Sequence, residues 1–131
     1  MFRLRKKTHY CLMALKHILS KENETSSARE IAEAYDIPFE VLAKLLQTLA
    51  RKGILVSRHG TKGGYSPARN PNSITLRDVM EAIEGPVALV ECAGPRKRPC
   101  GQERKCRVRS PLIKINKKVV DMLARTTLRE I

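Results

Sequence analysis

Apolar residues recur at the three- and four-residue spacing of an amphipathic helix in the first twenty positions of the chain. Polar residues 22–25 interrupt the pattern, so the sequence predicts one helix that ends before them. The apolar stripe of this helix consists of Tyr10, Cys11, Ala14, Leu15, Ile18 and Leu19. Because Cys11 lies inside that stripe, we expect it to be a core residue.

Two shorter helices follow, and a tight turn separates them. Ser27 and Glu30 have the spacing of a capping box, in which each side chain accepts a hydrogen bond from the other residue's backbone. Pro38 is expected to begin the second helix, since a first helical position needs no N–H, and Gly53 supplies a left-handed residue that ends it. Its apolar face is formed by Val41, Leu42, Leu45, Leu46 and Leu49. Two short helices joined in this way, the second with exposed polar residues, are typical of a helix-turn-helix.

A β-hairpin is predicted directly after the helix-turn-helix. Residues 54–57 indicate a short strand, and the basic segment 58–64 contains Gly60, Gly63 and Gly64, which permit the positive φ angles of a tight turn. A hairpin in this position is a wing. A further helix, capped by Thr75, is expected to end at Gly85 and Pro86.

The composition changes after residue 85. Glycines and prolines interrupt residues 93–109, which indicates a loop, and a long amphipathic helix capped by Ser110 and Pro111 follows it. The apolar stripe of that helix consists of Leu112, Ile115, Val119, Met122 and Leu123. It is longer than a small core can cover, so a second copy of the same helix is its natural partner.

The sequence thus predicts a mainly α fold, a winged helix-turn-helix with a two-stranded wing and a long C-terminal dimerisation helix. We expect a DNA-binding domain at residues 1–85, a cysteine-containing loop at 86–109 and the dimerisation helix at 110–131.

The charge balance narrows the function. The 131 residues carry 26 Lys and Arg against 13 Asp and Glu, a formal net charge of +13, which favours a nucleic acid or an acidic membrane face as partner. No stretch approaches the roughly 20 apolar residues of a spanning helix. The basic N-terminal residues are not followed by the apolar run of a signal peptide. We therefore expect a cytoplasmic protein whose partner is double-stranded DNA, with no membrane and no small-molecule substrate.

An enzyme has weak support in this sequence. The three histidines lie apart along the chain, and no Ser/His/Asp or phosphate-loop motif is present. We expect the protein not to be an enzyme.

Several short motifs lie between residues 60 and 85. They are Gly63-Gly64-Tyr65, Ala68-Arg69-Asn70-Pro71, Ile74-Thr75-Leu76-Arg77-Asp78-Val79 and Ala82-Ile83-Glu84-Gly85. In this order and spacing the chain resembles the Rrf2 family of bacterial transcription regulators, and the resemblance extends from Thr8 through the last helix. It implies a homodimeric winged-helix repressor or activator whose DNA affinity is controlled by a cysteine loop.

The second helix of the helix-turn-helix would lie in the major groove and present side chains to base edges, while nearby cations pair with phosphates. Its exposed side offers Glu40, Lys44, Gln47 and Thr48, of which the first two lie nearest the N-terminal end. IscR-like family members have acidic and amide residues where this chain has Ala43 and Lys44, so we expect a different operator.

The wing and the N-terminal segment complete the predicted DNA surface. The resemblance implies that the wing enters the adjacent minor groove, with Arg58, His59 and Lys62 as contact residues. Tyr65 would pack against the fold or touch a phosphate. Arg3 and Arg5 are expected to hold the DNA backbone.

Three cysteines, Cys92, Cys100 and Cys106, lie in the loop with seven and then five residues between them. Thiolates are soft ligands that suit an iron–sulfur cluster, zinc or copper(I), and the absence of C-x-x-C pairs lowers the case for structural zinc. The surrounding basic residues favour thiolate over thiol; they are Arg96, Lys97, Arg98, Arg104, Lys105, Arg107 and Arg109. The alternative is a solvated or phosphate-binding basic loop whose cysteines have no role.

The resemblance implies an iron–sulfur cluster, [2Fe–2S] or [4Fe–4S], on these three cysteines. IscR-like members supply a histidine three residues after the last cysteine, where this chain has Arg109. NsrR-like members supply an acidic residue from the first helix of the other subunit, and the matching position here is His9. His9 is therefore our candidate fourth ligand across the dimer interface, the alternative being a surface or DNA-proximal histidine.

Two other functions compete with a cluster-controlled regulator. One is a cluster-free regulator of the same family that responds through cysteine oxidation or a protein partner. The other is a zinc-stabilised DNA-binding module.

Overall fold

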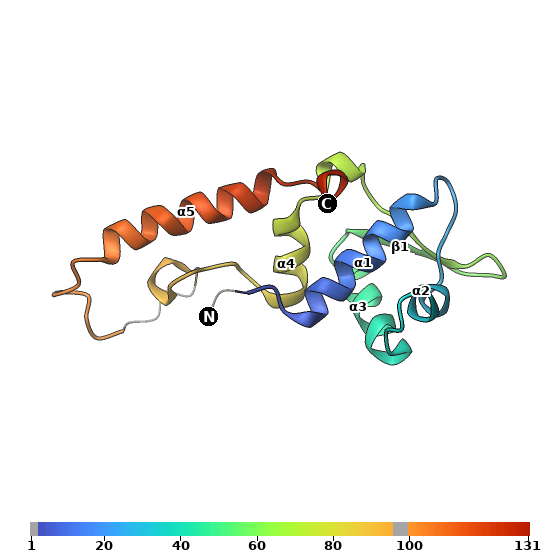
Figure 1. The fold of residues 1–131 in the computed structure, drawn as a ribbon, viewed down its shortest axis with the longest axis horizontal. Coiled ribbons are helices and arrows are strands. Elements are labelled where there is room, and N and C mark those ends of the chain that lie inside the picture. Colours follow the sequence, from blue (N-terminus) through green and yellow to red (C-terminus); the bar gives the residue numbers. More distant parts are fainter. Residues whose placement is uncertain (1–2, 96–99) are drawn as a thin grey trace.

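The computed structural model describes residues 3–95 and 100–131. The regular structure of these residues is mainly helical, with one two-stranded antiparallel sheet. In chain order the elements are α1 (Lys6–Ser20), α2 (Ala28–Ala34), α3 (Phe39–Arg51), β1 (Leu55–Arg58), β2 (Gly64–Pro67), α4 (Leu76–Glu84) and α5 (Arg109–Arg125), with short 3₁₀ turns at Pro71–Ser73, Glu91–Ala93 and Leu128–Glu130. Helices α1 to α4 and the hairpin form one body, and α5 with the preceding loop extends from it on one side (Figure 1). The predicted winged helix-turn-helix is confirmed.

The core lies where α1, α3 and α4 meet. Leu15, Ile18, Leu46 and Val79 are fully buried there, and Cys11 is buried beside them. These residues come from the apolar stripes that the sequence predicted, because helical spacing alone decides which side chains share a face.

The helix-turn-helix, α2 and α3, agrees with the prediction except at its caps. The Glu30 N–H donates to Ser27 Oγ at 3.1 Å, as expected, but the Glu30 carboxylate does not cap the helix in return. It accepts a hydrogen bond from Lys21 instead, because the end of α1 brings that ammonium to the start of α2. The predicted capping box is therefore wrong in its second half. Helix α3 begins at Phe39, one residue later than expected, with Pro38 as its N-cap, and Gly53 has the predicted positive φ of 77°.

The wing is the antiparallel pair β1 and β2, in which Leu55 faces Pro67 and Arg58 faces Gly64. The first strand runs one residue further along the chain than predicted. The free edge of β2 is tied to the segment before α2, since Ser26 N–H donates to Tyr65 O at 3.0 Å and Tyr65 N–H donates to Ser26 O at 2.8 Å. One edge of β2 thus pairs with β1, and the other fixes the hairpin to the body.

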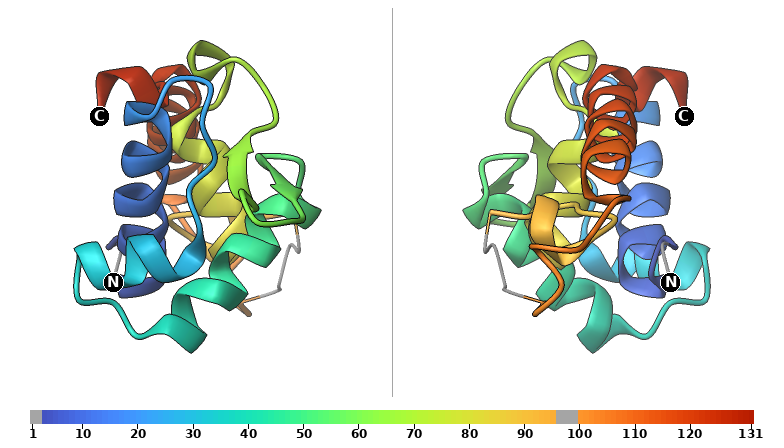
Figure 2. Two further views of the ribbon diagram at one scale, coloured as in Figure 1. Left: turned by 90° about the vertical axis from the view of Figure 1, so that its right-hand side faces the viewer. Right: turned by 90° about the vertical axis from the view of Figure 1, so that its left-hand side faces the viewer.

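Helix α4 has the predicted start and end. Thr75 and Asp78 form a reciprocal capping box, and Gly85 follows the helix with a φ of 87°. The chain returns to this helix start near its C-terminal end, which the sequence did not predict. Leu128 is buried and its N–H donates to Ile74 O at 2.9 Å, so the turn after α5 is anchored on the main body (Figure 2).

Helix α5 differs from the prediction at its start and in its faces. It begins at Arg109 without a side-chain cap, so the predicted cap at Ser110 is wrong. The predicted apolar stripe divides between two faces, because Leu123 is buried against the chain's own core whereas Met122 is 58% exposed. Consecutive residues of a helix point about 100° apart, so they cannot share one contact. None of the helices in residues 3–95 and 100–131 is long and apolar enough to cross a membrane.

Candidate nucleic-acid interface and cysteine loop

The solvent-facing side of α3 is set by the burial of its other side. Leu42, Leu46 and Leu49 are fully buried in the core, which leaves Glu40, Lys44 and Gln47 exposed on the opposite side. A helix held in this way can present these side chains to the edges of bases.

Thr48 differs from the other predicted residues of α3. It is half-buried, its hydroxyl donates to Lys44 O at 2.9 Å, and it accepts from Arg51 Nη2 at 3.2 Å. Its hydrogen-bonding groups are therefore engaged within the helix.

The sequence analysis missed two residues at the start of the helix-turn-helix. Phe39, the first residue of α3, is 42% exposed. The guanidinium of Arg29, from the first turn of α2, lies over the Phe39 ring at 4.6 Å from its centroid. The available signal was the place of an aromatic residue directly after Pro38, at the N-terminal end of the predicted recognition helix.

The wing presents Arg58, His59 and Lys62, all three exposed, at and beside its tip. The Thr25 hydroxyl donates to Lys62 O at 2.6 Å, which ties the tip to the segment before α2. Tyr65 is half-buried and packs against the core. Of its two predicted roles, the structure shows the packing role.

The N-terminal candidates lie on and before α1. Arg3 is exposed, and Arg5 Nε lies 3.4 Å from Glu84 Oε1 of α4. The Arg5 side chain remains 77% exposed despite this ion pair, so its guanidinium is accessible to a phosphate. His9 is exposed on α1.

The three loop cysteines differ in exposure. Cys92 lies in the 3₁₀ turn at 91–93 and is half-buried, as is Cys106, while Cys100 is exposed. The Cys100 N–H donates to Glu103 Oε1 at 2.8 Å, and such backbone hydrogen bonds lower the pKa of the Glu103 carboxyl.

Within residues 3–95 and 100–131, no three His, Cys, Asp or Glu side chains lie together in an arrangement that could hold a metal ion. The predicted basic residues Arg96, Lys97 and Arg98 lie outside the described residues. The donor chemistry nevertheless suits a soft metal or an iron–sulfur cluster, because the three cysteines of this loop form no disulfide with one another and none of them is buried.

Cys11 has a different environment. It is fully buried among apolar side chains of the core, and this burial raises the pKa of its thiol to about 12. The expectation that Cys11 is a core residue is confirmed.

The cysteine loop is hydrogen-bonded to α5 close to its first cysteine. The Leu89 N–H donates to Asn116 Oδ1 at 2.6 Å, and Asn116 is buried. The turn that holds Cys92 also contacts α5. The segment that holds Cys92 is therefore in direct contact with this helix.

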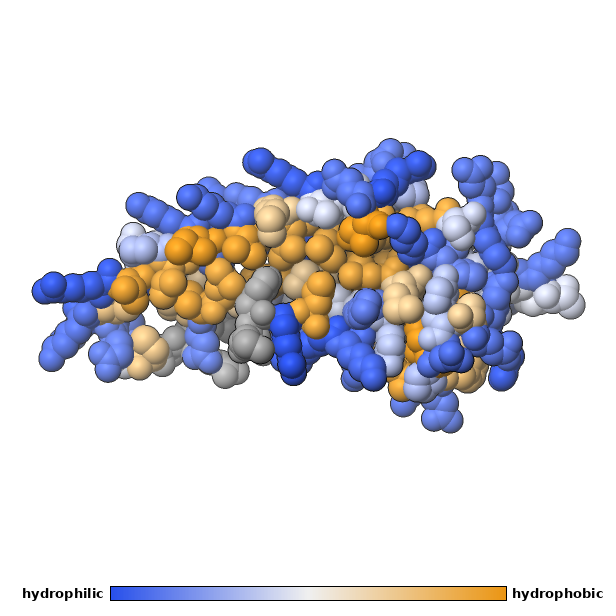
Figure 3. All heavy atoms as spheres, viewed as in Figure 1, coloured by the Kyte–Doolittle hydropathy of each residue, from blue (hydrophilic) through white to orange (hydrophobic). Residues whose placement is uncertain are grey.

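An apolar surface runs along the outward face of α5. Val108, Ile115 and Met122 are 57%, 47% and 58% exposed, and Leu112 and Val119 lie between them along the same face. Figure 3 shows apolar side chains gathered along this part of the molecule, whereas the rest of the visible face is mainly hydrophilic.

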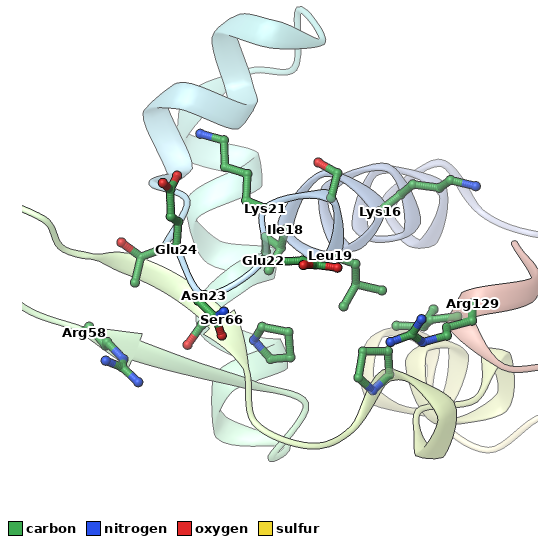
Figure 4. A pocket seen from close by; sticks show the side chains of 15 residues that line it. Lys16, Ile18, Leu19, Lys21, Glu22, Asn23, Glu24, Arg58, Ser66 and Arg129 are labelled. Carbon is green, nitrogen blue, oxygen red and sulfur yellow. The ribbon is translucent and has the colours of Figure 1, made fainter.

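A groove of about 760 Å³ lies between the end of α1, the wing and the C-terminal turn. Arg58 lies toward its wing end and Arg129 toward the other, with Glu22 and Glu24 on the segment that follows α1 (Figure 4). Its charges are mixed, unlike those of a surface that pairs with phosphates.

Comparison with known proteins covers almost the whole chain. Residues 4–131 match the family model Rrf2, described as an iron-dependent transcriptional regulator. The transcriptional regulator NsrR of Shouchella clausii is 26% identical over 95% of this chain and 84% of its own.

Two solved structures share the fold over nearly their full length. CymR, the global cysteine regulator of B. subtilis, has 26% identity and a TM-score of 0.77 over 99% of this chain and 95% of its own. IscR of T. potens has 23% identity and a TM-score of 0.74 over 98% of this chain and 85% of its own. NsrR and CymR are named as regulators, which agrees with the prediction that the chain is not an enzyme.

Proposed function

The chain belongs to the Rrf2 family of transcriptional regulators, and from this premise we propose that it is a homodimeric, sequence-specific repressor or activator whose affinity for its operator is controlled by an iron–sulfur cluster in the cysteine loop. DNA binding is the function of the family. The observation that carries the sequence-specific part is the solvent-facing side of α3 beside a basic wing that is hydrogen-bonded to the body.

In this proposal α3 lies in the major groove, where Glu40 accepts from a base amino group and Lys44 and Gln47 donate to base acceptors. Arg58, His59 and Lys62 of the wing enter the neighbouring minor groove, where a cation gains from the negative potential. Arg3 and Arg5 pair with phosphates. The net charge of +13 supplies the long-range attraction.

The apolar face of α5 is the proposed dimer contact. Val108, Leu112, Ile115, Val119 and Met122 alternate at three- and four-residue spacing, the pattern by which two helices pack along a common seam. A twofold dimer would place two α3 helices at two half-sites of one operator.

Cys92, Cys100 and Cys106 are the proposed cluster ligands, with His9 of a second copy as the fourth. A bound cluster would supply redox and nitric-oxide sensitivity to the regulator. Convergence of the three thiolates on one site would draw the two halves of the loop together. The nearby cations Arg104, Lys105 and Arg107 would offset the negative charge of a thiolate-ligated cluster.

The Leu89–Asn116 hydrogen bond gives the proposed route from the loop to the DNA. Because Leu89 precedes Cys92 by three residues, movement of the cysteine shifts the contact with α5, and α5 packs on α4. The two copies of α3 would then change their separation, and operator affinity would follow it.

The DNA-binding part is tested by selecting binding sequences from a random duplex library with the purified protein, followed by fluorescence anisotropy on the best sequence. We expect a marked preference over scrambled duplex. For about six neutralised phosphates, affinity should fall roughly a thousandfold between about 50 and 200 mM salt. Equal affinity for all duplexes would contradict the proposal.

The cluster is tested by anaerobic purification with iron and sulfide analysis and visible absorbance. Iron and sulfide in equal amounts, lost in the Cys92→Ala variant but kept in Cys11→Ala, would support it. A His9→Ala protein with an unchanged spectrum and redox potential would remove His9 from the ligand set.

A second candidate is control by cysteine oxidation without a cluster. The exposure of Cys100 favours it, and so does the similarity to CymR, a cysteine regulator. Protein that is colourless after anaerobic purification and loses operator affinity reversibly on peroxide treatment would select this candidate.

A further inference from the structure

An aromatic side chain lies partly in solvent at the start of α3, beside the face that presents Glu40 and Gln47. Phe39 is 42% exposed, whereas Leu42 and Leu46 of the same helix are buried in the core. One turn further on, Ala43 is half-buried and lies on the same side of the helix as Phe39. Phe39 and Ala43 therefore form a small apolar surface beside the exposed polar face that contains Glu40 and Gln47.

The ring is held in place by a cation. The Arg29 guanidinium carbon lies over it at 4.6 Å from the centroid, a cation–π contact that does not itself use the guanidinium N–H groups as hydrogen-bond donors. In the described part of the chain, no hydrogen bond or ion pair engages those N–H groups. The pair thus offers an apolar surface and a charged donor side by side.

We infer that Phe39 contacts the C5 methyl group of a thymine in the major groove and that Arg29 pairs with an adjacent phosphate, which makes this pair a determinant of operator specificity. The inference rests on the proposed function, and it identifies the base that the first residue of α3 contacts.

The chemistry of the major groove supports a thymine. Phenylalanine has no hydrogen-bonding group, so it cannot distinguish donors from acceptors on base edges, and the thymine methyl is the apolar group exposed in that groove. The N-terminal residues of a recognition helix reach base edges while the preceding helix crosses the backbone. This geometry would place Phe39 of α3 at a base and Arg29 of α2 at a phosphate.

The test uses the full-length protein and the operator obtained by selection from random duplex. Each thymine of one half-site is replaced in turn by deoxyuridine, which keeps base pairing and lacks only the methyl group. We expect one thymine at which wild-type protein loses about fourfold in affinity, the value of one methyl group removed from water. Losses at no thymine would overturn the inference.

Three variants then assign the methyl contact. Phe39→Ala should bind the thymine and deoxyuridine operators equally well at that position, and Phe39→Leu should keep part of the difference. Gln47→Ala, on the same helix face, is the matched control and should lose affinity while keeping the full difference. If Phe39→Ala retains the fourfold difference, Phe39 does not read the methyl group. Circular dichroism and a thermal melt confirm that each variant is folded.

Arg29→Gln tests the phosphate contact. It should weaken binding to all duplexes to a similar extent and reduce the slope of log affinity against log salt by about two, one for each subunit of the proposed dimer. An unchanged slope would overturn the role given to Arg29. If the selection yields no preferred sequence, the proposed function itself fails. A selected operator without methyl dependence removes only the inference about Phe39.

Discussion

Asn116 is a polar residue on the buried face of α5, and its amide oxygen accepts the hydrogen bond from Leu89 N–H at 2.6 Å. A polar group inside an apolar contact destabilises the fold unless it is paired. Asn116 meets this condition and also fixes the position of the loop three residues before Cys92. The residue therefore serves stability and the proposed signal together.

Replacing Asn116 with Ala should lower the free energy of unfolding by about 1–3 kcal/mol, because the Leu89 N–H loses its acceptor in a partly buried site. Urea denaturation monitored by circular dichroism measures the change. Lys117→Ala, at an exposed neighbouring position, is the control and should change stability by less than about 0.5 kcal/mol. Equal stability of Asn116→Ala and wild type would show that the hydrogen bond contributes nothing.

The cysteines should differ in their reaction with iodoacetamide. Burial raises the pKa of Cys11 to about 12, so at pH 8 its thiol stays protonated and unreactive, while the exposed Cys100 is labelled. We expect Cys11 to remain unlabelled in the folded apo protein even at pH 9, which is still well below its raised pKa. Peptide mass spectrometry after timed labelling measures this. Rapid labelling of Cys11 would contradict the buried position, and labelling in denaturant is the positive control.

At the scale of elements, the wing depends on a close backbone approach. Gly64 has a φ of 150°, and a Cβ atom there would lie 2.6 Å from Ser26 O, so only glycine allows β2 to pair with the segment before α2. The density of glycines in the sequence predicts a turn, but it does not distinguish the glycine of the tip from the one that packs against another segment.

Gly64→Ala should therefore destabilise the protein by roughly 2–5 kcal/mol, the sum of backbone strain and a contact that must open. Gly60→Ala is the matched control, because Gly60 also has a positive φ of 113° but no atom within 4 Å of the added Cβ. The Gly60→Ala variant should lower the free energy of unfolding by only about 1–2 kcal/mol, because it adds backbone strain alone. Thermal melts of both variants measure the difference in stability. If the two variants lose the same stability, the backbone at Ser26 moves away from the added Cβ without cost.

At the scale of the whole molecule, the outward face of α5 exposes Val108, Ile115 and Met122. Contiguous exposed apolar residues often mark protein–protein contacts, and we propose that this face is the dimer contact. Its position beyond the main body means that a partner helix would link two complete DNA-binding units.

Met122→Lys should separate the proposed dimer, since it places a charge within the C-terminal part of an apolar contact. Size-exclusion chromatography with light scattering should give half the wild-type mass, and the salt dependence of operator binding should fall to about half its slope. Lys117 lies on the opposite side of the helix, so the Lys117→Ala variant should keep the wild-type mass. A Met122→Lys protein with the wild-type mass would place the interface elsewhere.

Much of the fold was predictable from the sequence, because the spacing of apolar residues is a local property. The stripes of α1 and α3 and the caps at Gly53, Thr75 and Gly85 all follow from neighbouring residues. The exposed faces of α3 and the wing could be predicted in the same way. Their contacts with DNA stay predictions, as does the cluster on the three loop cysteines.

The sequence by itself therefore determined the elements, the surplus of positive charge and the residues available for base reading and ligation. Tertiary structure alone decided which partners those residues contact. Examples are the hydrogen bond between Lys21 and Glu30, the cation–π contact between Arg29 and Phe39, and the hydrogen bond between Leu89 and Asn116. The physical reason is range. Periodicity and caps act over a few residues, whereas these contacts join side chains and backbone groups of different elements, and only the packing of the core brings those elements together.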